Sequence, residues 1–137
     1  MPTNPILGDG GIHHMALRVS DFDRSITFYT TVLGFAERAS WNETPNRIAL
    51  LDTGNRSYLE LFEAKGEPPK IENAFWHLAF RVADAGACLE HARNAGCPVH
   101  VETKTVPNIG NSGIDIRVAF CKGPDGEIIE FFQCDKL

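Results

Sequence analysis

The sequence lacks the features that mark several other classes of protein. Its 137 residues contain no apolar run near the roughly 20 residues that a membrane-spanning helix needs. Lys and Arg total 13 against 18 Asp and Glu, a net charge of −5, so no basic excess favours nucleic acid. The N-terminal residues lack the basic and apolar regions of a signal peptide. We therefore expect a cytoplasmic protein with neither nucleic-acid nor membrane partners.

Cysteine is sparse and its spacing is uninformative for metal or redox chemistry. No C-x-x-C pair occurs, which argues against a zinc ribbon or a dithiol redox motif. Isolated cysteines in a reducing compartment usually behave as small buried hydrophobic residues. Hydrophobic residues make up 43% of the chain, enough for a buried core. The length favours a single domain, residues 1–137. The four cysteines are Cys88, Cys97, Cys121 and Cys134.

What the sequence does contain is an internal repeat. Residues 14–21 read HMALRVSD and residues 77–84 read HLAFRVAD, so most positions of the two segments are identical. Residues 58–62, YLELF, likewise resemble residues 128–132, IIEFF. Self-similarity of this kind indicates a repeated structural unit. Each copy begins with a histidine strand and ends with a glutamate strand.

The repeat predicts two modules, residues 12–63 and 75–133, joined by a polar connector near 63–74. Each module reads as a strand, a capped helix and three further strands, which is an α+β fold. The stretch Thr103–Gly113, rich in Gly, Asn and Pro, is expected to be the longest loop and a candidate lid. The expected strands cover residues 14–19, 35–41, 47–52, 57–63, 76–82, 98–102, 115–121 and 127–133.

Strand alternation predicts which faces the repeated polar residues occupy. Successive side chains of a strand point to opposite faces. The apolar residues that alternate with His14 must pack on the helix, so His14 lies on the other face, and His77 does the same in the second module. Glu60 and Glu130 each lie between apolar neighbours and are expected on the same non-helical faces. Alternation sends His13 to the helical face, where we expect a structural role.

The two His–Glu pairs predict a metal site. Two imidazoles and two carboxylates suit one divalent ion such as Zn, Ni, Co, Mn or Fe, and the carboxylates neutralise its charge. Taken alone, a strand His is more often hydrogen-bonded and a strand Glu more often solvated. The same pair in the same order in both modules favours ligands instead. His91 and His100 have no counterpart in the first half and are expected at the surface or in loops.

These residues carry a resemblance to a known family. Residues 13–35, HHMALRVSDFDRSITFYTTVLGF, resemble the opening strand and helix of the vicinal oxygen chelate superfamily, which includes glyoxalase I. Residues 123–132, GPDGEIIEFF, resemble its final hairpin. The likeness runs from about residue 11 to 133. It implies two βαβββ modules forming a curled sheet around a metal-binding cleft, and a homodimer whose modules pair within a chain or swap between chains.

The resemblance implies a role for each repeated residue. The ligand positions of the glyoxalase I branch fall on His14, Glu60, His77 and Glu130. Extradiol dioxygenases lack a ligand at the position of Glu60, fosfomycin-resistance thiol transferases use three ligands, and bleomycin resistance proteins lack the metal ligands. The full set therefore favours lyase, isomerase or epimerase chemistry through a metal-stabilised enediolate. Similarity to glyoxalase I implies Glu130 as the main base, with Glu60 available on the opposite face of the substrate.

The resemblance implies a small substrate with neighbouring oxygens, and two arginines indicate that this substrate is an anion. Arg18 lies on the predicted ligand face, where glyoxalase I has an arginine for glutathione, and Arg81 matches it in the second module. Guanidinium groups suit an anionic substrate, such as the methylglyoxal–glutathione hemithioacetal. The residues after Glu60 depart from the E-L-T-x-N-W-G of lactoylglutathione lyases. An acyl-CoA epimerase resembling methylmalonyl-CoA epimerase, or a non-catalytic small-molecule binding protein, therefore stays an alternative.

Overall fold

The computed structural model describes residues 12–43, 46–64 and 76–137. The chain divides into two compact units, Met1–Pro69 and Lys70–Leu137, and each is described by itself. The predicted connector falls outside the described residues, apart from its first two positions. Within the described residues, no helix is long and apolar enough to cross a membrane.

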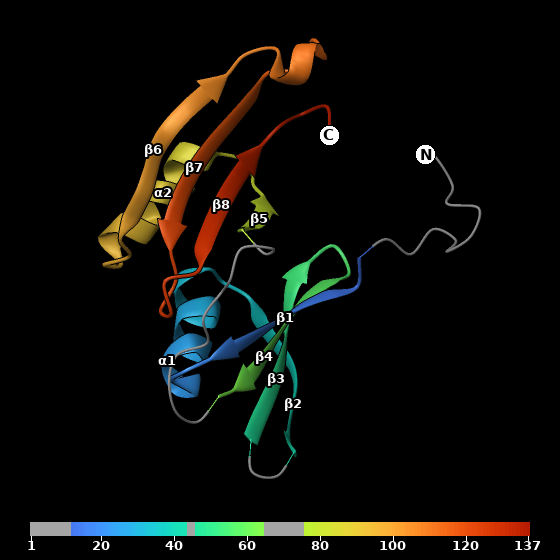
Figure 1. Cartoon of the computed structure of the whole chain (residues 1–137), viewed down its shortest axis with the longest axis vertical. Helices are drawn as coiled ribbons and strands as arrows, with labels where there is room; N and C mark the ends of the chain where they lie inside the picture. Colours follow the sequence, from blue (N-terminus) through green and yellow to red (C-terminus); the bar gives the residue numbers. More distant parts are fainter. Residues whose placement is uncertain (1–11, 44–45, 65–75) are drawn as a thin grey trace, which may run out of the picture. The chain divides into compact units, whose positions relative to one another are not determined.

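Both units contain the same order of elements, a strand, a helical segment and three further strands (Figure 1). The predicted βαβββ repeat and α+β class are therefore confirmed. The first unit contains β1 (His14–Val19), α1 (Phe22–Thr27), the π-helix η1 (Phe28–Val32), β2 (Ala36–Glu43), β3 (Asn46–Gly54) and β4 (Ser57–Glu63). The second contains β5 (Leu78–Arg81), α2 (Ala85–Asn94), β6 (Val99–Val106), the 3-10 helix η2 (Ile109–Asn111), β7 (Ile116–Lys122) and β8 (Ile128–Gln133).

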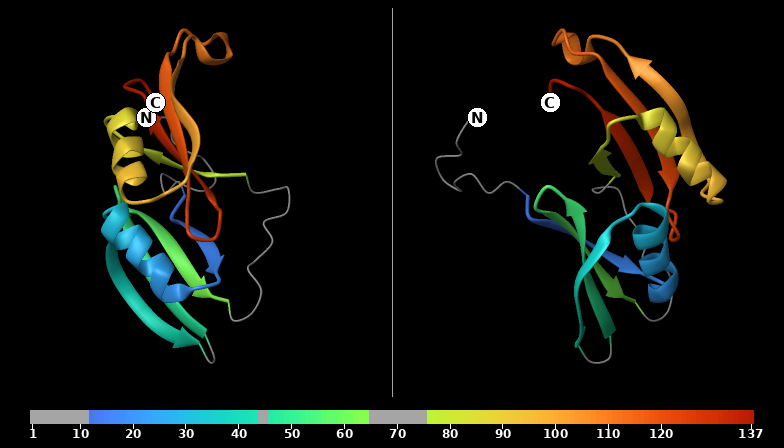
Figure 2. Two further views of the ribbon diagram at one scale, coloured as in Figure 1. Left: turned by 90° about the vertical axis from the view of Figure 1, so that its left-hand side faces the viewer. Right: turned by 180° about the vertical axis from the view of Figure 1, so that it is seen from behind.

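Each unit folds into a four-stranded mixed sheet in which the first strand lies beside the last. The strand order is β1-β4-β3-β2 in one sheet and β5-β8-β7-β6 in the other. The pairs β1–β4 and β5–β8 are parallel, whereas the remaining neighbours are antiparallel. Each helix covers one face of its own sheet (Figure 2). The opening and closing strands of each repeat are thus neighbours although they are distant in sequence.

Each helix begins after an aspartate that caps its first turn. Asp21 caps α1 by accepting a hydrogen bond from the backbone N–H of Arg24 at 3.0 Å. Asp84 caps α2 by accepting one from the N–H of Ala87, also at 3.0 Å. A side-chain oxygen at this position satisfies one of the free N–H groups of the first helical turn. The same device therefore starts the helix in both copies of the repeat.

The predicted loop Thr103–Gly113 is in part a strand and a helix. β6 continues to Val106, and η2 forms part of the remainder. The β-branched residues of T-K-T-V favour an extended strand, and β7 supplies the paired backbone.

All four cysteines are free thiols. Cys121 is fully buried, and burial raises the pKa of its thiol to about 12, so it behaves as a neutral core residue.

Truncating the core of the first sheet is expected to be strongly destabilising. Leu61 of β4 is fully buried and pairs in register with Leu17 and Ala49. Leu61→Ala should lower the free energy of unfolding by about 2–5 kcal/mol, because a central strand cannot close the cavity. Urea denaturation at fixed protein concentration measures the change. Leu137→Ala at an exposed position is the matched control, and equal stabilities of the two variants would contradict the assignment of Leu61 to the core.

Candidate functional site

The first unit brings His14 and Glu60 together. Parallel pairing of β1 with β4 sets His14 opposite Tyr58 and Ala16 opposite Glu60, so the polar side chains share one face. His14 Nε2 lies 3.3 Å from Glu60 Oε2. The alternate residues of β4, Leu59 and Leu61, are buried. The pair thus projects from the sheet face opposite the buried core.

The second unit repeats this arrangement with His77 and Glu130. The predicted strand 76–82 is shorter in the structure, so that His77 directly precedes β5. Ala79 of β5 pairs with Glu130 of β8. His77 Nε2 lies 2.9 Å from Glu130 Oε2. The neighbouring Ile129 is fully buried on the other face. Each unit therefore presents one imidazole nitrogen next to one carboxylate oxygen.

The environments of the two carboxylates differ. The Glu130 side chain is 10% exposed and that of Glu60 is 14% exposed. Burial raises the pKa of the Glu130 carboxyl, and the nearby His77 opposes this rise in part. Desolvation disfavours a carboxylate, which makes it a stronger proton acceptor. Glu130 thus has the environment expected of a base.

The two arginines lie on the same sheet faces as the pairs. Arg18 alternates with His14 along β1 and pairs in register with Phe62. Arg81 ends β5 and pairs with Phe132. Both are exposed, and among the described residues neither guanidinium forms an ion pair with an acid. Both are therefore available to an anion on these faces.

His13 lies beside His14, contrary to the sequence-based expectation. Its Nδ1 lies 3.0 Å from His14 Nδ1, and its ring centre lies 4.9 Å from that of Tyr58. The reason is that β1 begins only at His14, so strict alternation does not extend to the preceding residue. No signal in the sequence distinguished this arrangement from a regular strand.

Aromatic residues border His77 in the second unit. The Phe120 ring meets His77 edge-on at 5.8 Å and His100 at 6.5 Å. Phe120 pairs with Glu130 across the β7–β8 hairpin. It was not among the site residues predicted from the sequence, although its distance from the Gly123–Gly126 turn indicates that it lies opposite Glu130. His100 belongs to β6. Trp76 is 78% exposed, and the centre of its ring lies 6.3 Å from that of the His77 ring.

The donor chemistry fits a divalent metal, but each unit supplies only part of a coordination shell. A nitrogen and an oxygen about 3 Å apart can bind the same ion, and an N₂O₂ set suits borderline divalent metals. Across residues 12–43, 46–64 and 76–137, no group of three or more His, Cys, Asp or Glu side chains gathers at one point. A complete site therefore needs more than one pair.

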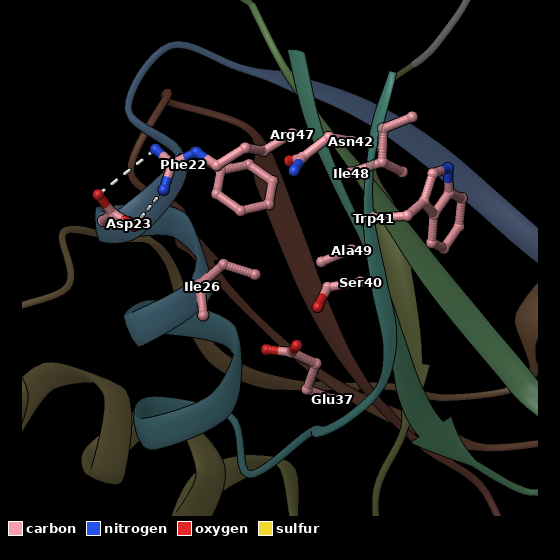
Figure 3. A pocket seen from close by; sticks show the side chains of 10 residues that line it. All are labelled: Phe22, Asp23, Ile26, Glu37, Ser40, Trp41, Asn42, Arg47, Ile48 and Ala49. Atoms are coloured by element: carbon pink, nitrogen blue, oxygen red, sulfur yellow. Dashed lines mark hydrogen bonds and ion pairs between the residues drawn. The ribbon is translucent and has the colours of Figure 1, made fainter. Parts of the chain in front are cut away.

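A pocket of about 320 Å³ in the first unit is distinct from the His14–Glu60 pair (Figure 3). It lies between α1 and the strands β2 and β3, and neither His14 nor Glu60 lines it. The Arg47 guanidinium at its rim lies 2.9 Å from Asp23, 3.0 Å from Glu63 and 4.7 Å from the centre of the Phe22 ring. These contacts of Arg47 join α1 to β3 and β4, so we assign Arg47 a structural role.

The family of the chain follows from comparison with known proteins. The model of the Glyoxalase/Bleomycin resistance protein/Dioxygenase superfamily matches residues 11–131. The chain belongs to this superfamily. Its doubled βαβββ architecture agrees with the resemblance drawn from the sequence. The superfamily contains several activities, and its members share the fold rather than one reaction.

Individual glyoxalase-type relatives cover almost the whole chain. A probable lactoylglutathione lyase of Vibrio parahaemolyticus is 32% identical over 93% of this chain and 93% of its own length. The lactoylglutathione lyase of Salmonella typhimurium is 36% identical over 88% and 90%. A solved structure of Leishmania major glyoxalase I, described as trypanothione-dependent, is 30% identical over 89% and 85%, with a TM-score of 0.73. These names support an enzyme of the glyoxalase superfamily that acts on a small molecule.

Proposed function

We propose that the protein is a divalent-metal-dependent lyase or isomerase of the glyoxalase I type. The observation that carries the proposal is the repeated contact of a strand histidine with a strand glutamate, once in each unit. One ion would be held by His14, Glu60, His77 and Glu130. The two pairs would come from the modules of one glyoxalase-like domain or from two copies in a homodimer. When bound, a divalent ion supplies Lewis-acid stabilisation of an enediolate.

The two carboxylates would transfer the substrate proton during the reaction. Glu130, the more buried of the two, takes the proton from the hydroxyl-bearing carbon next to the carbonyl and returns it to the carbonyl carbon. The hydroxyl proton passes to the former carbonyl oxygen, so the first carbon becomes the new carbonyl. The raised pKa of Glu130 supports this role because a general base works best when its pKa lies near the working pH. Glu60 holds the second position on the opposite face of the substrate. The reaction is an isomerisation in which no atom is gained or lost.

The arginines would bind the anionic part of the substrate. Arg18 and Arg81 lie on the same sheet faces as the His–Glu pairs and have no acidic partner among the described residues. A guanidinium binds a carboxylate through two parallel hydrogen bonds. The methylglyoxal–glutathione hemithioacetal carries such carboxylates, and relatives named lactoylglutathione lyase support this substrate.

Turnover of this hemithioacetal by metal-reloaded protein tests the proposal. Metal-stripped protein would be reloaded separately with Ni²⁺, Co²⁺, Zn²⁺ and Mn²⁺, and metal occupancy would be measured. We expect no thioester formation by the stripped protein and formation by at least one reloaded form. Arg18→Lys and Arg81→Lys, which keep the charge but lose the bidentate geometry, should raise KM more than they lower kcat. Full metal occupancy without turnover would exclude this substrate.

A second candidate is epimerisation of an acyl-CoA. It is favoured by the segment after Glu60, Leu61-Phe62-Glu63-Ala64-Lys65-Gly66, which departs from the lactoylglutathione lyase pattern. Two carboxylates on opposite faces of a substrate carbon suit proton removal from one face and return to the other. Incorporation of solvent deuterium at the α-carbon of a branched acyl-CoA would distinguish it from thioester formation. Metal binding with a ligand recovered intact would instead favour a binding protein.

A further inference from the structure

His13 contacts His14 on the side away from Glu60. The Nε2 of His14 lies 3.3 Å from Glu60 Oε2, whereas the Nδ1 of the same ring lies 3.0 Å from His13 Nδ1. We propose that His13 is a positioning residue, which fixes the orientation and tautomer of His14 so that Nε2 is free to bind a metal ion. This inference rests on the proposed function, in which His14 is a ligand.

His13 is itself held in place by β4. Its backbone carbonyl accepts a hydrogen bond from the Tyr58 N–H at 2.9 Å. Its ring lies 4.9 Å from the Tyr58 ring, at an interplanar angle of 33°. Tyr58 precedes Glu60 by two residues on the same face of the same strand. The carboxylate and the imidazole that contact His14 are therefore both anchored to β4.

A hydrogen-bond acceptor is the usual partner of a metal-binding histidine. A ring that binds through Nε2 carries its proton on Nδ1, and that N–H is a hydrogen-bond donor. His13 Nδ1 provides a lone pair when the His13 proton is on its own Nε2. Metal-binding histidines usually donate their second N–H to an acceptor, and loss of that acceptor weakens metal binding by about 10–100-fold. His13 is placed to be this acceptor.

The second unit offers an internal comparison. Trp76 precedes His77 as His13 precedes His14, but the indole N–H is a donor only and cannot accept this proton. The Nδ1 of His77 is buried and has no hydrogen-bond partner among the described residues. Only the first of the two repeated histidines therefore has an imidazole acceptor. The effect of His13 should be confined to His14.

The test compares two substitutions of His13 by zinc affinity and by NMR. His13→Phe keeps a ring against Tyr58 but removes the acceptor, whereas His13→Asn places an amide oxygen close to the position of Nδ1. Zn²⁺ is the probe because it is diamagnetic, and its Kd is measured by competition with a chelator. His13→Phe should weaken zinc binding by about 10–100-fold, and His13→Asn should restore most of the affinity. Trp76→Phe, the matched control, should bind zinc as the wild type does.

The spectroscopic readout separates positioning from a general structural effect. In zinc-loaded wild type and His13→Asn, ¹⁵N spectra should show the proton of His14 on Nδ1 and protected from solvent exchange. His13→Phe should lose that protection while its circular dichroism is unchanged. Wild-type zinc affinity in His13→Phe would overturn the inference. Complete loss, as expected for His14→Gln, would overturn it too, because His13 would then be a ligand. Wild-type affinity in His14→Gln would refute the proposed function itself.

Discussion

Glu130→Gln is expected to abolish most turnover while leaving the fold intact. Gln has nearly the shape of Glu and its amide oxygen can still face His77 Nε2, which lies 2.9 Å from the Glu130 carboxylate. The amide cannot take a proton, so the base is lost. General acid–base catalysis typically contributes about 10²–10⁴-fold, and we expect a loss of kcat in that range. The measurement is thioester formation from the hemithioacetal at equal metal occupancy.

Proton exchange provides the sharper readout for Glu130. In deuterated water the wild type should exchange the substrate proton next to the carbonyl, whereas Glu130→Gln should not. Because Glu130 is also a proposed ligand, metal content must be measured in each sample. Glu102→Gln is the matched control, since that side chain is 68% exposed and lies 2.7 Å from Arg93. Wild-type exchange in fully metallated Glu130→Gln would show that another group is the base.

His14→Gln and His77→Gln should each remove the same metal ion. If one ion is shared by the two pairs, either substitution lowers the amount bound from one ion per chain toward none. If each pair binds its own ion, the amount falls from two to one. Loss of a direct ligand should weaken binding by more than the roughly 100-fold upper range for outer-shell partners. Equilibrium dialysis against Zn²⁺ or Ni²⁺ gives both the stoichiometry and the Kd.

A third histidine controls for changes in overall histidine content. His91 lies on α2 and is exposed, so His91→Gln should bind metal as the wild type does. The stoichiometry experiment holds whether the pairs meet within one chain or between two copies, because the ion count per chain is the same. Two independent ions, each lost with one substitution, would refute the shared site and leave two separate two-ligand sites.

Much of the architecture was predictable because it is written in local patterns. Asp21 and Asp84 mark helix starts through contacts with the backbone of residues only three positions later. The alternation around His14 and Glu60 follows from the two-residue period of a strand. The duplication of these signals predicted two βαβββ modules. Such features depend on neighbouring residues, so a single sequence is enough to detect them.

Local patterns failed where an element ended or where another strand intervened. The stretch Thr103–Gly113 reads as a loop by composition, but pairing with β7 extends β6 to Val106. His13 reads as a strand residue facing the helix, but β1 begins one residue later, and its ring lies against Tyr58 of another strand. Both errors concern the limits of elements, which are set by pairing partners rather than by the segment itself.

The sequence by itself determined the repeat, the strand faces and the candidate residues of this superfamily member. Only the tertiary structure decided which of these residues touch. The His14–Glu60 and His77–Glu130 contacts depend on the parallel pairing of the first and last strand of each unit. The register of that pairing is chosen by the burial of both strands' apolar faces. That choice involves residues far apart in the chain, so local periodicity gives the face of each side chain but not its partner across the sheet.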